Sequence, residues 1–503
     1  MKKKIIYWII AVFLGFVIVS CETLTTPDVE QELEILSFGS SSGMRAGDDT
    51  EIKWINNTGR PVTMDLMQNG EYFLRVGTFA HMMTEYCWSI PEDIVPGQSY
   101  SLLLYVSDEN SISAVTKTFS IAEKENLQPF VVITEPRDGK YVKKGSTVLI
   151  RSEAWDEDGD VIAVEYFINN EFFASITNGD YAFEWSSSSA EEGIYKIEAV
   201  AVDNKGERSE QYSINIVISD QEDFNELVRV PTGSFTMGSL SGDHDEKPAN
   251  LVYITQDYYI GKFTVTNRDY AAILNYAMTQ NEIAADFVNN INVLNLHGSQ
   301  RELVKLDGFE GGLKYDGTVF RAREGFENRP VVWVSWWGAA FYSNMLSRKL
   351  NLEELYDLTD WTCDFSKTGY RMPTEAEWEY AATYNNNRIY PWGNTDPTSE
   401  LCNYNSNPGH TTPVGSYSPQ GDSGLGLADM AGNVWEWCND WYGYYPRNEV
   451  FYIDPTGPPG GTSKVIRGGS YNSTDYYIRT KYRNSYRLYA SRLNGMRIVL
   501  SIR

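Results

Sequence analysis

The chain has 503 residues, of which 42% are hydrophobic and 22% charged, and its net charge is −26. At about 150 residues per domain, this length predicts about three domains, and the apolar content excludes global disorder. The acidic balance excludes nucleic acid as the main partner, because a phosphate-binding surface needs a basic field. The 5 Cys are too few for a disulfide scaffold, and the 4 His leave little material for a histidine metal site.

The first 20 residues have the features of a secretion signal. Lysines at positions 2–4 precede an uncharged apolar run over residues 5–19, which is short for a bilayer span. The run ends at Ser20 and Cys21, and this ending resembles a bacterial lipobox, in which the Cys is acylated and becomes the new N-terminus. The pattern predicts a signal peptide at 1–20, a lipid anchor at Cys21 and a place in the bacterial cell envelope outside the cytoplasm. The alternative is an ordinary signal anchor with an incidental Cys21.

Such a compartment is oxidising, so disulfide bonds become an option for the other thiols. Their pairing does not follow from the sequence. The four Cys concerned are Cys87, Cys363, Cys402 and Cys438.

Two strand-rich modules follow a polar linker at 21–32, and we place them at 33–125 and 126–222. In both modules short apolar runs alternate with polar residues, which is typical of half-buried strands. The clearest runs are 50–54, 72–76, 100–106, 131–133, 147–150, 161–168, 195–202 and 212–218. The sequences around 49–106 and 154–170 resemble bacterial immunoglobulin-like modules. We therefore expect two all-β sandwiches that serve as spacers or adhesive arms.

An acidic loop at 156–160 in the second module has carboxylates that suit Ca²⁺. It is not an EF-hand, because Phe167 stands where the loop needs a bidentate Glu. We favour an acidic β-turn over a calcium site, because Asp and Gly are common turn residues.

From residue 223 to 503 the sequence becomes dense in Trp and Tyr and alternates less cleanly. Ser335 stands at an N-cap position and predicts a helix over 336–349. Thr374 and Glu377 have the spacing of a capping box and predict the start of a second helix. Seven ordered motif blocks occupy 231–239, 259–267, 330–336, 369–382, 390–394, 426–437 and 465–471.

These blocks resemble those of the formylglycine-generating enzyme (sulfatase-modifying factor) family. The resemblance covers about residues 225–503, and residues 275–325 look like an insertion in it. It implies an α+β domain related to the C-type lectin fold. The whole chain is then multi-domain, with two immunoglobulin-like sandwiches before this domain.

The resemblance implies an oxidase that uses copper and oxygen to convert a Cys of a sulfatase peptide to formylglycine. Family members hold Cu(I) with two Cys near the C-terminus, and the matching positions here are Ser473 and Ile478. Soft Cu(I) prefers thiolate ligands, which neither residue supplies. We therefore expect a catalytically degenerate domain that does not use copper.

A second activity in the family uses iron held by clustered His, but every His in this sequence is isolated. The four positions are His81, His244, His297 and His410.

The resemblance also implies structural calcium. Asn433 and Glu436 match a block that supplies calcium ligands in family members, and Asn403 matches the position of another ligand. The alternative is that Asn433 and Glu436 only satisfy buried backbone groups.

The last 40 residues, 464–503, carry nine Lys or Arg and a single acid, Asp475. Tyr and Arg alternate there, and such side chains make rigid, directional contact surfaces. The segment resembles the ligand-binding segment of lectin-fold variable proteins, and the alternative is that its Arg residues pair with carboxylates inside the domain. The predicted contact face consists of Tyr471, Asn472, Ser473, Asp475, Tyr476, Tyr477, Arg479, Tyr482, Arg483, Tyr486 and Arg487.

The first hypothesis is a membrane-tethered, extracytoplasmic lipoprotein whose degenerate domain binds an unidentified protein, peptide or glycan. The rival is a formylglycine-generating oxidase that acts on a Cys-containing sulfatase peptide. A third hypothesis is a scaffold within an envelope assembly.

Overall fold

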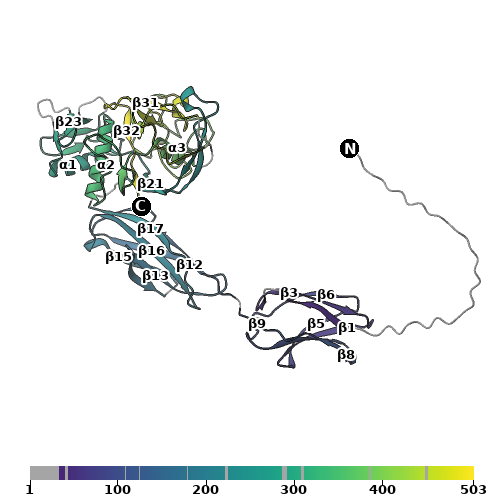
Figure 1. Ribbon diagram of the computed structural model, residues 1–503. Helices are drawn as coiled ribbons and strands as arrows, with labels where there is room; N and C mark the ends of the chain where they lie inside the picture. The colour runs from purple at the N-terminus through teal and green to yellow at the C-terminus, as the bar shows by residue number, and fades with distance from the viewer. Residues whose placement is uncertain are drawn as a thin grey trace, which may run out of the picture. The chain divides into compact units, whose positions relative to one another are not determined.

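The computed structural model describes residues 33–39, 43–107, 109–123, 125–177, 179–220, 225–285, 292–306, 311–384, 387–447 and 451–502. The predicted signal peptide, Cys21 and the linker at 21–32 lie outside these ranges. The chain divides into two compact units, Met1–Asn126 and Leu127–Arg503 (Figure 1). Within the described ranges, no helix is long and apolar enough to cross a membrane.

The first unit consists of β-sheets around one core. One sheet has the strand order β1-β3-β6, a second has β5-β4-β7-β8, and β2 pairs with β9. Residues along β7 alternate between buried and half-buried, as the period-2 pattern predicted. The strands are β1 (Leu33–Phe38), β2 (Met44–Arg45), β3 (Asp49–Asn56), β4 (Val62–Gln68), β5 (Glu71–Phe79), β6 (Glu85–Ser89), β7 (Tyr100–Val106), β8 (Glu109–Val115) and β9 (Ile121–Ala122).

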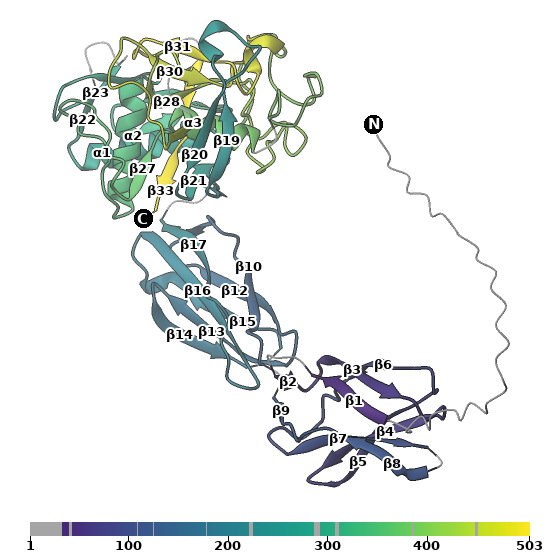
Figure 2. The same ribbon diagram turned by 45° about the vertical axis from the view of Figure 1, so that its right-hand side comes forward.

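The second unit begins with two further sheets, β10-β12-β15 and β11-β17-β16-β13-β14, which enclose their own core (Figure 2). Strand β13 covers the predicted run 161–168. In the acidic loop, Asp156 accepts a hydrogen bond from the backbone N–H of Asp158 at 3.1 Å, the geometry of an Asx-turn. The elements are β10 (Phe130–Glu135), β11 (Tyr141–Lys143), β12 (Thr147–Trp155), β13 (Val161–Ile168), β14 (Glu171–Ile176), β15 (Ala182–Ser186), η1 (Ser187–Ser189), β16 (Gly193–Asp203) and β17 (Tyr212–Ser219).

The rest of the second unit combines helices with short strands and long loops. Its sheets have the orders β18-β21-β33-β27, β19-β20-β29, β31-β30-β28-β32, β22-β23-β24 and β25-β26. The helices are α1 (Asn267–Thr279), α2 (Trp336–Lys349) and α3 (Glu375–Thr383), with η2 (His244–Glu246) and η3 (Asp475–Ile478). The strands are β18 (Leu227–Val230), β19 (Gly233–Met237), β20 (Asn250–Ile254), β21 (Tyr258–Gly261), β22 (Ile283–Ala285), β23 (Asn292–Asn295), β24 (Glu302–Lys305), β25 (Leu313–Tyr315), β26 (Phe320–Ala322), β27 (Gly369–Arg371), β28 (Trp435–Trp441), β29 (Phe451–Ile453), β30 (Lys464–Arg467), β31 (Asn484–Tyr486), β32 (Asn494–Met496) and β33 (Val499–Ser501).

Both helix starts predicted from the sequence are confirmed. The Ser335 hydroxyl accepts a hydrogen bond from the N–H of Gly338 at 2.9 Å and caps α2. Thr374 and Glu377 form the reciprocal capping box of α3. Helix α1, which the sequence analysis did not predict, begins with a capping box of Thr266 and Asp269. Helix α1 extends to Thr279 and so includes the first residues of the proposed insertion at 275–325.

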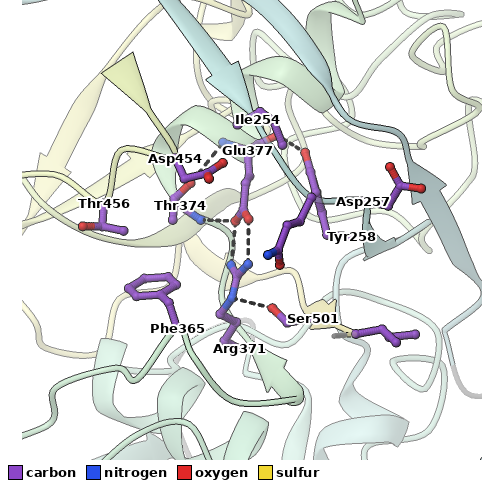
Figure 3. Close-up of a pocket in the computed structure, with 12 residues that line it drawn as sticks. Ile254, Asp257, Tyr258, Phe365, Arg371, Thr374, Glu377, Asp454, Thr456 and Ser501 are labelled. Atoms are coloured by element: carbon purple, nitrogen blue, oxygen red, sulfur yellow. Dashed lines mark hydrogen bonds and ion pairs between the residues drawn. The ribbon is translucent and has the colours of Figure 1, made fainter.

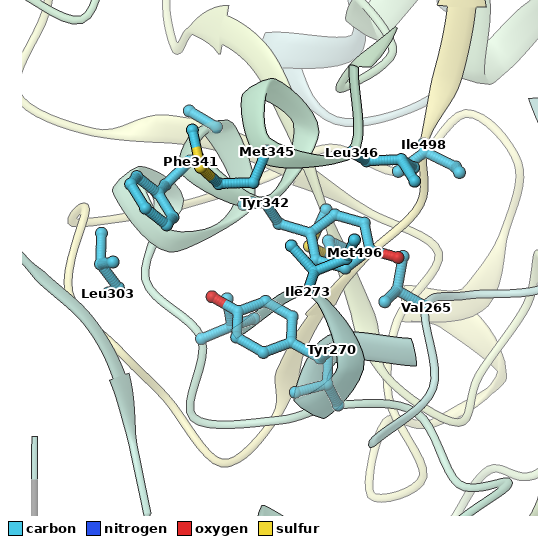
Figure 4. Packing of buried hydrophobic residues seen from close by; sticks show 14 of the residues in the cluster. Val265, Tyr270, Ile273, Leu303, Phe341, Tyr342, Met345, Leu346, Met496 and Ile498 are labelled. Atoms are coloured by element: carbon cyan, nitrogen blue, oxygen red, sulfur yellow. The ribbon is translucent and has the colours of Figure 1, made fainter. Parts of the chain in front are cut away.

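Helices α1 and α2 lie side by side over the largest core of the second unit (Figure 4). Tyr270 of α1 stacks on Tyr342 of α2, with ring centroids 5.2 Å apart. Met496 and Ile498, near the C-terminus, fill the space beside these helices. The C-terminal segment is therefore part of the core.

The module at 127–219 joins this domain through polar and apolar contacts. The ammonium group of Lys349, at the end of α2, lies 3.1 Å from a Glu192 carboxylate oxygen and 2.9 Å from one of Asp220. The hydroxyls of Tyr141 and Tyr370 are 2.8 Å apart. Because apolar side chains of the module also pack into the core of the domain, residues 127–502 form one unit.

Replacement of Ser335 by Ala is expected to destabilise the domain by about 1–2 kcal/mol, because a helix N-terminal N–H then loses its acceptor. Ser335 also donates to the carbonyl of Glu302 at 2.6 Å, which favours the upper end of this range. Urea unfolding followed by tryptophan fluorescence measures the loss. Ser241→Ala, at an exposed position, is the matched control. Equal midpoints for the two variants would contradict the capping role.

Candidate functional site

The two positions that correspond to the family's copper ligands lie inside the domain. Ile478 is 0% exposed and Ser473 is 7% exposed. Ile478 packs in a small cluster with Tyr390, Cys402 and Ala431. The Ser473 hydroxyl accepts a hydrogen bond from the N–H of Ser470 at 3.0 Å. These positions are covered by their neighbours and do not line an open cleft.

Cys402 is the thiol that packs in the same cluster as Ile478. Burial raises the pKa of Cys402 to about 12, and the negative charge of Asp429 acts in the same direction. A protonated thiol is a poor ligand for Cu(I), because the metal binds thiolate. In the structure Cys402 is thus a buried, protonated thiol in an apolar cluster.

The described cysteines form no disulfide bond with one another. All four are free thiols: Cys87, Cys363, Cys402 and Cys438. Cys402 and Cys438 belong to separate apolar clusters, which keeps their sulfur atoms apart.

A buried ionic network connects helix α3 to the C-terminal segment. Arg467 is fully buried and pairs with Glu379 and, at 3.2 Å, with Glu375. Arg483 donates to both carboxylate oxygens of Glu375, at 2.6 and 2.7 Å. The alternative in which the tail's Arg residues pair inside the domain is confirmed for these two. Glu375 and Glu379 are one helical turn apart, a spacing visible in the sequence but not used in its analysis.

The residues predicted to hold calcium do not fit a cation centred on Glu436. Both carboxylate oxygens of Glu436 accept from the Arg497 guanidinium, at 2.7 and 2.9 Å, and one also accepts from Trp378. The Asn433 side chain bonds to Asn403 at 3.2 Å and to the backbone of Thr412. A calcium ion would have to displace the guanidinium, a cation that already satisfies the carboxylate. The described residues also contain no cluster of three or more His, Cys, Asp or Glu placed to bind a metal.

The predicted contact face is only partly at the surface. Three of its members are buried and cannot contact a ligand at the surface: Tyr471, Ser473 and Arg483. Tyr471 and Ser473 lie in tight turns, and Arg483 forms its ion pair with Glu375 in the buried network. The exposed members are Asn472, Asp475, Tyr476, Tyr477, Tyr486 and Arg487, while Arg479 and Tyr482 are half-buried.

The exposed part of this face has an aromatic centre. The rings of Tyr476, Tyr477 and Tyr482 meet edge to face, with centroids 5.0 to 5.6 Å apart. The Arg479 guanidinium lies 4.2 Å from the Tyr476 ring centroid and pairs with Glu246 at 2.7 Å. Tyr489, in the same Tyr-rich tail, is 60% exposed.

A separate small cavity of about 90 Å³ lies between β21 and the start of α3 (Figure 3). Figure 3 shows the Arg371 guanidinium facing Glu377, and both contacts measure 2.6 Å. Arg371 also donates to the Ser501 hydroxyl at 3.0 Å. Because these groups satisfy one another and the volume suits only a few waters, this cavity is structural.

Comparison with known proteins agrees with this architecture. The family model described as the sulfatase-modifying factor enzyme 1-like domain matches residues 215–502, more than half of the chain. The chain belongs to this family. A bacterial Ig domain model matches residues 129–199.

Formylglycine-generating enzyme from Streptomyces coelicolor is 33% identical over 297 residues, which cover 53% of this chain and 83% of that protein. Serine/threonine-protein kinase pkn1 from Chlamydia caviae is 30% identical over 270 residues. The match covers 53% of this chain but only 36% of that kinase. Among solved structures, Treponema denticola variable protein 1 matches with a TM-score of 0.41 and 25% identity, over 58% of this chain and 96% of that one.

Asp429, close to Cys402, gives the domain a pH dependence. Burial raises the pKa of Asp429 to about 6, although the N–H of Gly415 donates to it at 2.7 Å. In the unfolded chain the pKa is about 3.9, so the folded protein takes up a proton between these values. The resulting stabilisation is complete below pH 4 and is lost as the pH rises through 6.

Asp429→Asn removes the free-energy cost of ionising this buried carboxyl group, and its side-chain carbonyl still accepts the hydrogen bond from the N–H of Gly415. Asn also tolerates the positive φ of 56° at this position. We expect the free energy of unfolding of the variant, relative to that of the wild type, to rise by about 1–2 kcal/mol as the pH goes from 4 to 7. Urea unfolding at a series of pH values measures the difference. Glu400→Gln, at an exposed carboxylate, should show no such trend. A constant difference across the range would contradict the assignment.

Proposed function

We propose that the domain is a catalytically degenerate member of its family that binds a ligand instead of oxidising one. The observation that carries the proposal is the burial of Ile478 within an apolar cluster at a position where the family's oxidases need a thiolate. Ser473 supplies only a hydroxyl, which is a poor ligand for soft Cu(I). We propose accordingly that the chain does not use copper.

The same proposal gives the exposed part of the tail a role in recognition. Tyr476, Tyr477 and Arg479 form an aromatic and cationic surface on a base that the buried Ile478 anchors. Large side chains on a fixed base lose little entropy on binding, which favours contact surfaces of this composition. The class of ligand proposed is a protein, peptide or glycan.

We further propose that the chain is a lipoprotein of the bacterial cell envelope, anchored through Cys21 outside the cytoplasm. Both modules before residue 223 are proposed to be immunoglobulin-like sandwiches, and the last domain an α+β fold related to C-type lectins. The two modules then act as spacers between the membrane and the ligand. Support comes from the signal-like N-terminus and from the alternating strands.

Replacement of Cys21 by Ser is expected to move the protein from the membrane fraction to the soluble fraction, because the thiol that takes the acyl chain is gone. Fractionation of a bacterium expressing the full chain, with immunoblotting, measures the change. Cys87→Ser is the matched control. Membrane association that survives Cys21→Ser would overturn the anchor.

A copper titration tests the loss of oxidase activity. We expect the purified chain to compete weakly with a Cu(I) chelator and to leave a Cys-containing sulfatase peptide unmodified by mass spectrometry. Formylglycine-generating enzyme from Streptomyces coelicolor provides the positive control. Stoichiometric Cu(I) binding together with aldehyde formation in the peptide would reverse the proposal in favour of the oxidase.

A further inference from the structure

A second, larger cavity of about 390 Å³ lies against β19, β20 and the first turn of α3, and Arg483 contributes to its lining. Its walls are mainly aromatic and proline side chains. They include Tyr444, Tyr445, Tyr452, Pro455, Pro458 and Pro459. The volume is in the range of small-molecule sites, which are concave and mostly apolar with a few polar groups.

One carboxylate in this cavity has no cationic partner. Asp440, on β28, is only 4% exposed, and one of its oxygens accepts from the N–H of Glu375 at 2.9 Å. Its other oxygen has no hydrogen bond to a described residue, and no Lys or Arg of the described chain lies within ion-pair distance of it. Burial raises the pKa of Asp440 to about 7, and the charge of Glu375 adds to this effect. A buried carboxylate without a counter-ion is costly.

No charged neighbour among the described residues forms an ion pair with Asp440. Arg483 lines the cavity, but it donates to both Glu375 oxygens and to the carbonyls of Asp245 and Gly443. The positive charge of Lys464 partly offsets the rise in the pKa of Asp440, but its ammonium group donates to the carbonyl of Asn439 at 2.6 Å.

Lys464 is also held away from the cavity by aromatic rings. Its ammonium lies 4.0 Å from the ring centroid of Trp336 and 4.1 Å from that of Trp441. Burial lowers the pKa of Lys464 to about 7, so part of its population is neutral at that pH. Of the two carboxylates that line the cavity, Glu375 forms an ion pair with Arg483, and Asp440 forms none with a described residue.

We propose that this cavity binds an organic cation: an ammonium group on a short alkyl chain, placed against the free oxygen of Asp440. The alkyl part packs on the Tyr and Pro walls, and the Tyr ring faces attract the positive charge. The net charge of −26 raises the local concentration of such cations around the protein. Either a free amine or the side chain of a Lys in a peptide carries this chemistry. The site is independent of the recognition face proposed above.

Calorimetry on the full chain tests the proposal with matched ligand pairs. n-Pentylammonium is compared with n-pentanol, which has nearly the same shape but no charge. Nα-acetyl-lysine methylamide is compared with its Nε-acetylated form, which separates a peptide source from a free amine. We expect each charged ligand to bind at least about tenfold more tightly than its neutral partner, because the hydrogen bond is charge-assisted. Equal affinity within both pairs, or no binding of either charged ligand at millimolar concentration, would overturn the proposal.

Asp440→Asn tests the residue itself. Asn keeps the shape and an acceptor for the Glu375 N–H, so the amine affinity should fall about tenfold while pentanol binding stays the same. Asp396→Asn, which makes the same change in charge at an exposed position, is the control and should bind as the wild type does. An unchanged amine affinity in Asp440→Asn would overturn the assignment. If this variant does not fold, the ligand pairs on the unchanged chain decide the question.

Discussion

The C-terminal domain depends on the buried ionic contact between helix α3 and the chain after β30. Arg467 and Arg483 supply two positive charges, and Glu375 and Glu379 supply two negative ones on successive turns of α3. Because all four charged groups are buried, each loses the stabilisation of its charge by water, and its ion-pair partners offset this loss. Removing one of them would leave an uncompensated charge in the interior, which typically costs about 3–5 kcal/mol.

This contact also decides what the segment between the two arginines can do. Arg467 and Arg483 hold its ends, and Ile478 fixes its middle in an apolar cluster. Between these anchors, Tyr476 and Tyr477 point outward and more than two-fifths of each side chain is exposed, at 43% and 41%. The same packing that closes the family's metal position therefore presents the aromatic surface. Both features follow from one arrangement of the segment between Arg467 and Arg483.

The sequence predicted best those features that local chemistry determines. The capping residues Ser335 and Thr374 mark helix starts because their hydroxyls bond to N–H groups only three residues away. Helix α1 was missed although Thr266 and Asp269 have the same spacing, because Asp replaces the more usual Glu or Gln.

Features that depend on distant partners could not be predicted in this way. The composition of residues 471–487 does not show which side chains turn inward, since the partners of Arg467 and Arg483 lie 88 and 108 residues away. The pairing of Glu436 with Arg497 could not be predicted for the same reason, because the two residues lie 61 positions apart in the sequence. The position of the Asp440 carboxylate in a cavity could not be predicted either, because the segments that line the cavity meet only in the folded domain.

The enclosure of position 478 limits what a substitution there can do. A mutation that restored sulfur there would place it among Tyr390, Cys402 and Ala431, where burial already keeps the neighbouring thiol protonated. Sulfur at position 478 alone would not line an open cleft, since the same cluster would still cover it. The packing of this cluster therefore restricts position 478 to side chains that fit a closed apolar space.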